Sequence, residues 1–302
     1  MIRILIFTTL LLFAGKSPEY SKPDKGLKNQ RPELVIGLMA DIQYCDCDSS
    51  GTRFYSNSLE KLEQAINEFN KHSLDFVVSL GDLIDRDYSS YNKVLPIINS
   101  SNAKVKHVIG NHDNEVAEEY KDSVFLRLKT VKGYYSFSQK GYRFIVLNSF
   151  DLNTKSLNTE KRLEAKYLIK NINDQNGING HQWNGGVGKK QKLWFIDELV
   201  DAADSNQKVV IFSHHPVWPQ SSLNILNYLE MLEVINNFNN IICWFAGHKH
   251  EGGYGNINKT HFVNMRGMVE TKTENAFAIV EFYPNKILIK GYGREKSQVL
   301  EY

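Results

Sequence analysis

The fold is decided by the stretch Val77-Val78-Ser79-Leu80-Gly81-Asp82-Leu83-Ile84-Asp85. A short apolar run that stops at a glycine is typical of a buried strand followed by a tight turn. The pattern places Asp82 at the carboxyl end of a strand, where open α/β sheets bind their ligands. Gly-Asp-x-x-Asp also fits the start of a helix, with Asp82 capping the first turn. The other motifs of the chain decide between these two interpretations.

Four other apolar runs also end at side chains that bind metals. The runs cover residues 34–40, 105–109, 209–213 and 241–246, and they are followed by Asp41 and Gln43, by Asn111 and His112, by His214, and by His248 and His250. Amphipathic helices predicted at 56–71 and around 94–98 separate the first three strands. Strands and helices that alternate at this spacing predict βαβ units and a largely parallel sheet.

The second half of the chain has a less regular pattern. We predict a hairpin from 134–137 and 144–147, helices around 193–200 and at 223–235, and strands at 261–265, 276–282 and 287–290. Residues 151–188 are rich in Asn and Gly and show little apolar periodicity, which predicts a long loop or a small cap-like insertion. Loops of this length are uncommon unless they have a function.

The start of the chain indicates where the protein acts. Residues 1–16 combine one early charge with an apolar run and fit a secretory signal peptide, which a polar linker at 17–32 and one domain at 33–302 follow. The apolar run is shorter than the roughly 20 residues that span a bilayer, so we expect no stable membrane insertion after processing. We expect export, to the periplasm or out of the cell, if this segment is cleaved, and a cytoplasmic protein otherwise.

Charge and cysteine content narrow the range of partners and bonds. The formal net charge is +2 over 302 residues and no basic block stands out, so we expect neither nucleic acid nor an anionic membrane as a partner. A monomer is expected. Three cysteines are too few for a disulfide framework. We interpret Cys45 and Cys47 as free loop thiols and Cys243 as a small core residue.

The five strand ends together predict a site for two metal ions. Carboxylate and amide oxygens mixed with imidazole nitrogens suit a hard or borderline divalent ion such as Mn²⁺, Mg²⁺, Fe²⁺ or Zn²⁺. With His112 set aside, the remaining donors are too many for one ion, and they suit two ions that share Asp82. Such a pair activates water and stabilises the leaving oxygen in displacement at phosphorus. A lone His-x-His is more often structural, but the joint occurrence at strand ends favours the metal site.

In this order the motifs resemble the calcineurin-like metallophosphoesterase superfamily, whose pattern is Asp-x-His, Gly-Asp-x-x-Asp, Gly-Asn-His-(Asp/Glu), a lone His and Gly-His-x-His. The resemblance covers about residues 34–290 and implies an α/β fold, a four-layer αββα sandwich of two mixed sheets flanked by helices. The chain departs from the pattern at Gln43, which stands where the first motif has His. An amide oxygen makes that site harder, so we expect Mn²⁺ or Mg²⁺ to be favoured there over Zn²⁺.

Within the superfamily, the stretches 40–44, 184–188, 247–254 and 266–271 resemble the manganese-dependent ADP-ribose/CDP-alcohol diphosphatases. This resemblance implies two bound manganese ions and a small nucleotide substrate of the type nucleoside diphosphate-X. Its pyrophosphate bond would be cleaved to a nucleoside monophosphate and a phosphorylated alcohol or sugar. Two alternatives stay open. One is a cyclic-nucleotide phosphodiesterase or nucleotidase of the same superfamily, and the other is a non-catalytic metal-binding module on this fold.

The same resemblance implies roles for the residues at the strand ends. The ligands that it implies for the first ion are Asp41, Gln43, Asp82 and His250, and for the second ion Asp82, Asn111, His214 and His248. It implies that His112 protonates or stabilises the leaving oxygen and that Asp85 orients His112. Of the two adjacent histidines that follow residue 213, we favour His214 as the ligand and interpret His215 as structural.

Loops beside the motifs supply candidates for substrate binding. Aromatic faces stack on nucleobases without reading their identity, and basic side chains meet phosphate oxygens. The candidates are Arg53, Phe54, Tyr55, Trp183 and Tyr254, with Trp218 and Lys249 as further possibilities. We expect one or two of the aromatic side chains to contact the base and the others to pack within their own loops.

Overall fold

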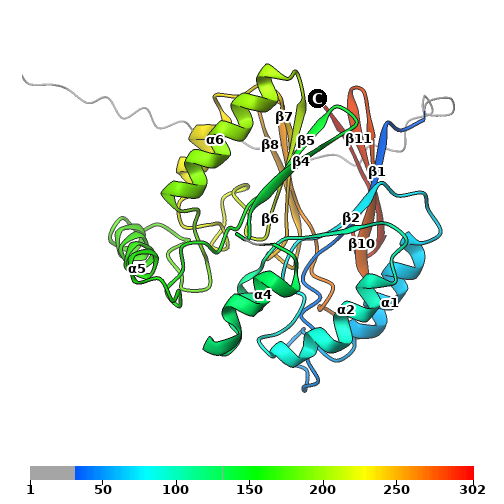
Figure 1. Cartoon of the computed structure of the whole chain (residues 1–302), viewed down its shortest axis with the longest axis horizontal. Coiled ribbons are helices and arrows are strands. Elements are labelled where there is room, and N and C mark those ends of the chain that lie inside the picture. Colours follow the sequence, from blue (N-terminus) through cyan, green and yellow to red (C-terminus); the bar gives the residue numbers. More distant parts are fainter. Residues whose placement is uncertain (1–30, 131) are drawn as a thin grey trace, which may run out of the picture. The chain divides into compact units, whose positions relative to one another are not determined.

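The computed structural model describes residues 31–130 and 132–302. This part of the chain forms two six-stranded sheets with helices beside them (Figure 1). The predicted signal peptide at 1–16 and the linker as far as residue 30 lie outside the described residues. None of the described helices is long and apolar enough to cross a membrane.

The first sheet contains the strand that precedes Asp82. In spatial order, its strands are β12 (Gln298–Glu301), β11 (Lys286–Gly293), β10 (Ala276–Tyr283), β1 (Leu34–Met39), β2 (Phe76–Ser79) and β3 (Val105–His107). Strands β1, β2 and β3 run parallel, and β10 lies antiparallel to β1. Helices α1 (Ser58–Phe69) and α2 (Tyr91–Asn99) pack on this sheet, because Leu62 and Ile98 share one buried apolar cluster with Val77.

The second sheet contains the strands that precede the histidines. In spatial order, its strands are β4 (Tyr135–Gln139), β5 (Tyr142–Val146), β6 (Lys208–Ser213), β7 (Ile241–Ala246), β9 (Thr260–Asn264) and β8 (Gly253–Ile257). Strands β5, β6, β7 and β9 run parallel, and β4 and β5 form the predicted hairpin. Helices α6 (Lys189–Asp204) and α7 (Tyr228–Ile235) pack on this sheet, because Phe195 and Met231 share a buried cluster with Ile211.

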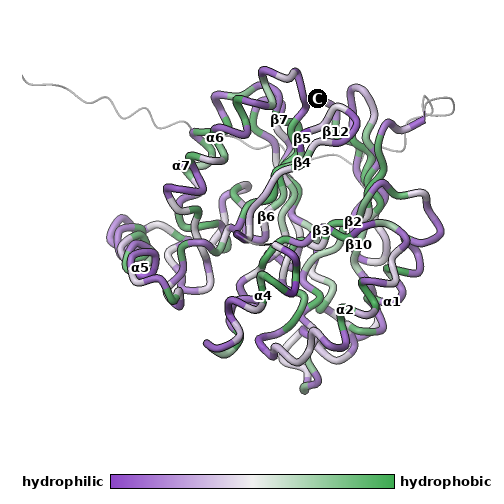
Figure 2. The backbone as a smooth tube through the Cα atoms, in the orientation of Figure 1, coloured by the Kyte–Doolittle hydropathy of each residue, from purple (hydrophilic) through white to green (hydrophobic). Residues whose placement is uncertain are grey.

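Fully buried aromatic rings join the two sheets face to face. The ring of Phe144 in β5 lies 4.9 Å from that of Phe76 in β2 and 6.3 Å from that of Phe282 in β10. One apolar cluster runs through both sheets, and Figure 2 shows hydrophobic positions gathered along the central strands. The prediction of a four-layer αββα sandwich of two mixed sheets is confirmed.

Several elements differ from the sequence-based expectation. Residues 151–188 contain a 16-residue helix, α5 (Thr159–Asp174), which was not predicted because only Ala165 is fully buried and the apolar pattern is weak. The predicted helix at 223–235 begins only at residue 228. The remaining elements are the short helices α3 (Asn111–Asn114) and α4 (Lys121–Arg127) and the 3-10 turns Tyr88–Ser90 and Glu118–Tyr120.

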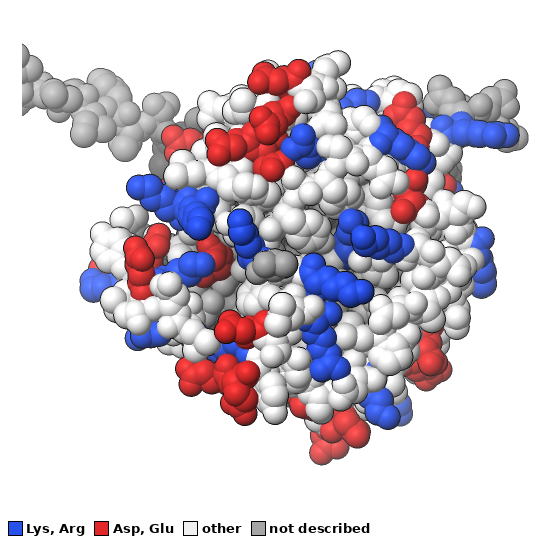
Figure 3. All heavy atoms as spheres, in the orientation of Figure 1, with Lys and Arg blue, Asp and Glu red and all other residues white. Residues whose placement is uncertain are grey.

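The expectation of free thiols in the loop after β1 is wrong. The structure joins Cys45 and Cys47 in a disulfide, with their Cα atoms 5.3 Å apart. This separation lies within the range that a disulfide spans. Cys243 is buried and free, in agreement with its predicted place in the core. On the face shown in Figure 3, acidic and basic side chains are interspersed rather than gathered into one block.

Replacement of Phe144 by alanine tests the contact between the sheets. The ring is fully buried and contacts both layers, so we expect Phe144→Ala to lower the free energy of unfolding by about 3–5 kcal/mol. Urea unfolding followed by circular dichroism measures the change. The control is Leu229→Ala in α7, which is 67% exposed and should change stability by less than about 0.5 kcal/mol. Equal effects of the two variants would contradict this role for Phe144.

Candidate metal centre

Four of the predicted ligands lie at turns with unusual backbone angles. Asp41, Gln43, Asp82 and His248 have φ angles of 52°, 44°, 53° and 63°, a left-handed region that residues other than Gly rarely adopt. Each such residue costs on the order of 1–3 kcal/mol and persists only where the surrounding structure enforces it. The turns enforce each other here, since the Gln43 N–H donates to the Asp82 carbonyl at 2.8 Å. Backbone strain of this kind gathers at functional sites.

Asp82 lies at the centre of the predicted ligand set. Its Oδ2 accepts a hydrogen bond from Gln43 Nε2 at 3.0 Å and lies 3.2 Å from His214 Nε2. His214 Nε2 is also 3.1 Å from Asn111 Oδ1. The first and second sheets therefore both deliver side chains to this carboxylate. The charged imidazole of His214 holds the pKa of Asp82 well below its ordinary value, although burial alone would raise it.

The remaining predicted ligands lie around Asp41. His250 Nε2 lies 3.3 Å from Asp41 Oδ1 and 3.4 Å from Gln43 Nε2. The backbone N–H of His248 donates to the Asp41 carboxylate, with distances of 3.0 and 3.2 Å to its two oxygens. The structure thus brings all seven predicted ligands together at the ends of β1, β2, β6 and β7 and at the start of α3.

The donor set fits a pair of divalent ions. Asp41 and Asp82 are both fully buried, and in the described part of the chain no lysine or arginine forms an ion pair with either of them. Buried charge of this kind requires a partner. Oxygen and nitrogen atoms of Asp41, Asp82 and His214 lie within 4.8 Å of one another. Two further buried donors, Gln43 Oε1 and His248 Nε2, have no hydrogen-bond partner among the described residues.

The pKa values of two histidines also show that the buried carboxylates favour positive charge beside them. Burial lowers the pKa of His214, but the Asp82 carboxylate outweighs it and raises the pKa to about 9. Burial also lowers the pKa of His250. The Asp41 carboxylate outweighs this effect and raises the pKa to about 9. The two carboxylates therefore attract positive charge to this point, and divalent ions carry such charge.

Hydrogen bonds behind the imidazoles set which nitrogen faces the cluster. His214 Nδ1 lies 2.8 Å from the Leu80 carbonyl, so Nδ1 carries the proton and Nε2 faces Asp82. His250 Nδ1 lies 2.7 Å from Glu270 Oε1, so its Nε2 faces Asp41. The hydrogen bond from His250 lowers the pKa of Glu270 to about 2. A carboxylate behind a ligating histidine fixes the ring and strengthens the ligand.

Glu270 and its support were not predicted from the sequence. A buried lysine, Lys61 of α1, donates to the carbonyls of Met268, Glu270 and Thr271 and so holds the loop that carries Glu270. Lys61 is 1% exposed, and burial lowers its pKa to about 8. The sequence did contain a signal for the buried position of Lys61. This lysine falls on the apolar face of an amphipathic helix, at the spacing of the other buried residues.

Asp113 joins the turns at the ends of β2 and β3. Its carboxylate accepts hydrogen bonds from the N–H groups of Asp82 at 2.8 Å, Leu83 at 3.1 Å and Gly110 at 3.0 Å, and from the Tyr91 hydroxyl at 2.8 Å. Burial and the nearby Asp82 raise the pKa of Asp113 to about 6. The sequence motif contained Asp113, but its role as a clamp depends on contacts that the sequence alone did not reveal.

The two predicted catalytic residues lie side by side at the edge of the cluster. His112 Nδ1 is 2.5 Å from Asp85 Oδ1, and His112 Nε2 is 4.0 Å from Asp82 Oδ2. The His112 N–H also donates to Asp82 Oδ1 at 2.8 Å, which fixes the backbone of the histidine. Asp85 therefore holds the far nitrogen of the ring, and the near nitrogen faces the cluster.

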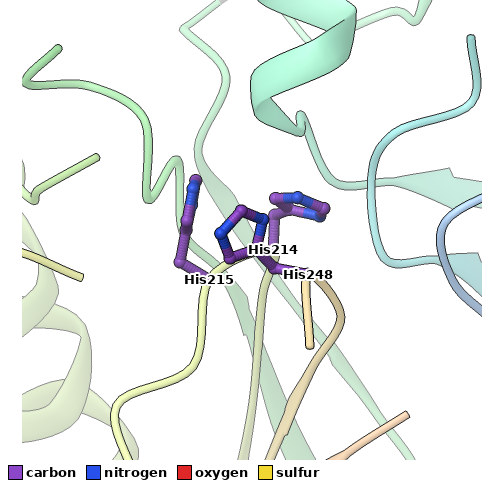
Figure 4. A group of neighbouring side chains, drawn as sticks. All are labelled: His214, His215 and His248. Carbon is purple, nitrogen blue, oxygen red and sulfur yellow. The ribbon is translucent and has the colours of Figure 1, made fainter. Parts of the chain in front are cut away.

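A third imidazole lies beside two of the ligands. Figure 4 shows His214 and His215, which follow β6, next to His248, which follows β7. The ring centroids of His215 and His248 are 4.2 Å apart. However, both ring nitrogens of His215 are engaged, with Ser149 Oγ at 2.9 Å and with the Trp183 carbonyl at 3.0 Å. Burial lowers the pKa of His215 to about 3, so this ring stays neutral.

Comparison with known proteins identifies the family. The family model of the calcineurin-like phosphoesterases matches residues 34–252. The chain belongs to the calcineurin-like phosphoesterase family. It is 30% identical to a manganese-dependent ADP-ribose/CDP-alcohol diphosphatase of Mus musculus, over 93% of this chain and 96% of that protein. A protein of the same name from Arabidopsis thaliana is 28% identical, over 91% of this chain and 99% of that protein.

A solved structure supports the same assignment. A dimetal phosphatase of Danio rerio matches this phosphoesterase with a TM-score of 0.82 at 25% identity, over 90% of this chain and 100% of that chain. The predictions of the family, of the fold class and of a metal-dependent hydrolase are confirmed by these comparisons.

A cavity of about 790 Å³ opens beside the metal centre of the phosphoesterase. Five of the predicted centre residues line it, namely Gln43, Asn111, His112, His248 and His250. Its walls also carry the basic side chains of Arg53, Arg86, Lys249 and Arg294. Arg86 is paired with Glu115 at 3.2 Å, and Arg53 lies 3.9 Å from Glu270. The cavity therefore joins metal donors to a cationic wall, which suits an anionic substrate.

The predicted substrate-binding residues divide into two groups. Arg53 and Trp183 line the cavity, and Trp183 is 47% exposed. Phe54, Tyr55 and Tyr254 are not among the residues that line it. Tyr254 packs against the apolar core between the sheets, and its hydroxyl lies 3.0 Å from His261 Nδ1. Among these aromatic candidates, the structure brings only Trp183 to the cavity.

Replacement of Glu270 by glutamine tests its support of His250. The amide can still accept the Nδ1 hydrogen bond but carries no charge, so we expect Glu270→Gln to weaken manganese binding by about 10- to 100-fold. Titration of metal-free protein against a fluorescent chelator measures the affinity. Glu251→Gln is the matched control, because Glu251 lines the same cavity and is exposed. Wild-type affinity in Glu270→Gln would contradict the proposed support.

Proposed function

We propose that this phosphoesterase hydrolyses the pyrophosphate bond of nucleoside diphosphate-X substrates such as ADP-ribose and CDP-alcohols. The products are a nucleoside monophosphate and a phosphorylated alcohol or sugar. The observation that carries the proposal is the cavity in which buried metal donors, a cationic wall and one exposed indole meet. A substrate with two phosphates between a base and a second group matches these three features. The names of the relatives, manganese-dependent ADP-ribose/CDP-alcohol diphosphatases, point to the same substrates.

We assign the donors to two ions as the family resemblance implies. Asp41, Gln43, Asp82 and His250 would hold one ion, and Asp82, Asn111, His214 and His248 would hold the other. Manganese fits the first group, because the amide oxygen of Gln43 is a harder ligand than an imidazole. When bound, such a pair supplies a nucleophile from water near neutral pH and offsets the charge that develops at phosphorus.

The residues of the chain contribute binding and proton transfer. Arg53, Lys249 and Arg294 line the wall of the cavity where the phosphate oxygens would lie. As the bridging P–O bond breaks, His112 Nε2 gives its proton to the leaving phosphate oxygen. Asp85 holds the opposite nitrogen at 2.5 Å and keeps the ring in the orientation that this transfer needs. Trp183 offers an exposed ring face on which the base can stack.

A matched panel of substrates tests the proposal. The purified protein with Mn²⁺ is assayed on ADP-ribose, CDP-choline, a cyclic nucleotide and a nucleoside monophosphate, with products identified by chromatography. We expect nucleoside monophosphate from the first two substrates and no turnover of the other two. Cleavage of the cyclic nucleotide or the monophosphate instead would keep the dimetal chemistry and refute the substrate class. No turnover of any substrate would favour a non-catalytic module.

Replacement of His112 by alanine tests the proton donor. We expect His112→Ala to lower kcat on ADP-ribose by about 10²- to 10⁴-fold, because no other described side chain is paired with Asp85 at this edge of the cluster. Its manganese content, measured by mass spectrometry, should stay at the wild-type value, since His112 is not in either ligand group. His72→Ala, at an exposed position shortly after the end of α1, is the control. Full turnover of His112→Ala would remove His112 from the mechanism.

A further inference from the structure

His215 connects the metal centre to the loop that carries Trp183. It follows the proposed ligand His214 directly, and its ring lies 4.2 Å from that of His248, a second proposed ligand. Its Nε2 lies 3.0 Å from the Trp183 carbonyl. One imidazole therefore contacts both the metal-binding histidines and the backbone of the cavity-lining tryptophan.

The hydrogen bonds of His215 fix where its proton lies. A carbonyl can only accept, so the Trp183 contact requires the proton on Nε2. Nδ1 of the neutral ring is then the acceptor, and the Ser149 hydroxyl donates to it at 2.9 Å. The same Ser149 oxygen accepts the backbone N–H of His215 at 2.9 Å. Ser149 thus sets both the position and the tautomer of the ring.

The ring of His215 is also held by packing. It is fully buried and stacks on Phe150 with an interplanar angle of 10° and a centroid distance of 5.7 Å. Its carbonyl accepts from Ser213 Oγ at 2.7 Å. A ring fixed on its faces, its edges and its backbone gives a rigid point of attachment for the Trp183 carbonyl.

The loop that carries Trp183 has further contacts that hold its backbone in place. The next residue, Asn184, is fully buried and donates to the carbonyls of Asn179 at 2.8 Å and Ser222 at 2.7 Å. Gly185 approaches the Ser149 carbonyl so closely that a Cβ there would lie 2.3 Å from the oxygen. The backbone next to the indole is thus anchored, while Trp183 as a whole residue is 47% exposed and lines the cavity. Its ring stacks on that of His181, with centroids 4.4 Å apart.

We propose that His215 is a positioning residue that holds Trp183 as a fixed stacking surface for the nucleobase, at a set place relative to the metal centre. The proposal deepens the proposed function and rests on its nucleotide substrate. Loss of the His215 contact would leave the partly buried Trp183 carbonyl without this partner and release the indole. The chemistry would keep its metal donors, but the contribution of the base to binding would fall.

Binding of two products separates base recognition from phosphate recognition. AMP and ribose 5-phosphate share the sugar and the phosphate and differ by the base, so the ratio of their Kd values measures the contribution of the base. Calorimetric titration of the manganese-loaded protein gives both values. A stacked base adds about 1–3 kcal/mol, so we expect AMP to bind roughly 5- to 150-fold more tightly in the wild type.

Five single variants and one double variant test the role of His215. Trp183→Ala removes the surface, and His215→Phe keeps a ring of similar shape but no hydrogen bonds. We expect both to reduce the ratio to about 3 or less, and the double variant to show no further loss, because the two residues act as one unit. His215→Gln can still donate to the Trp183 carbonyl and should recover part of the ratio. Ser149→Ala should lower it in part and serves if His215→Phe does not fold.

The fifth single variant, His261→Phe, is the matched control. His261 is also a buried histidine between a hydroxyl and a carbonyl, with Tyr254 at 3.0 Å and Glu301 at 2.8 Å, but it does not line the cavity. It should keep the wild-type ratio. Manganese content and the Kd of ribose 5-phosphate should be unchanged in every variant, since none of them alters a proposed ligand.

The outcomes distinguish this inference from the proposed function. A wild-type ratio near 1, or His215→Phe with the wild-type ratio while Trp183→Ala loses it, would overturn the positioning role. An equal loss of both ligands with a loss of manganese would overturn it as well, because His215 would then support the metal centre. If the ratio falls as expected but the wild type does not cleave ADP-ribose, the positioning role stands and the proposed substrate is wrong.

Discussion

Two carboxylates buried where the sheets meet are the constraint on which the rest of this structure depends. Asp41 and Asp82 are fully buried, and moving a charge into the interior costs several kcal/mol unless it is compensated. Their neighbours among the described residues are imidazoles and amides rather than lysines or arginines. The divalent ions of the proposed centre would supply the missing charge, and the local fold and metal binding would then depend on each other.

The backbone around these carboxylates follows from their position. A Cβ at Gly110 would lie 2.0 Å from Asp82 Oδ1, and one at Gly247 would lie 2.9 Å from Asp41 Oδ2, so glycine is required where the chain passes each carboxylate. Left-handed turns at both aspartates aim the strand ends at one point. Asp113 then ties the turn at Asp82 to the backbone at Gly110 through their N–H groups. The left-handed backbone angles, the glycines beside the carboxylates and the hydrogen bonds of Asp113 all follow from the burial of Asp41 and Asp82 at one point.

The sequence was sufficient for the parts that depend on local pattern. Apolar runs followed by polar donors placed the strand ends, because neighbouring parallel strands bring their carboxyl ends to one edge. It was insufficient where a role depends on distant contacts, as for Lys61, which reaches carbonyls more than 200 residues away. Helix α5 was missed because it buries little. Tyr254 and Trp183 looked equivalent as loop aromatics, but only the fold assigns one to the core and the other to the cavity.

The proposed metal centre and the cavity wall come from different kinds of structural element. The adjacent residues His214 and His215 connect the two. Strand ends, stiffened by sheet hydrogen bonds, supply the proposed metal donors, whereas loops supply the other groups that line the cavity. A loop is the less rigid support, so a ring surface on it needs its own anchor to hold a base at a fixed distance from the reacting phosphorus. His214 and His215 follow the same strand, and one turns to Asp82 while the other turns to the Trp183 carbonyl. The rigidity of β6 is thereby extended into the wall of the cavity.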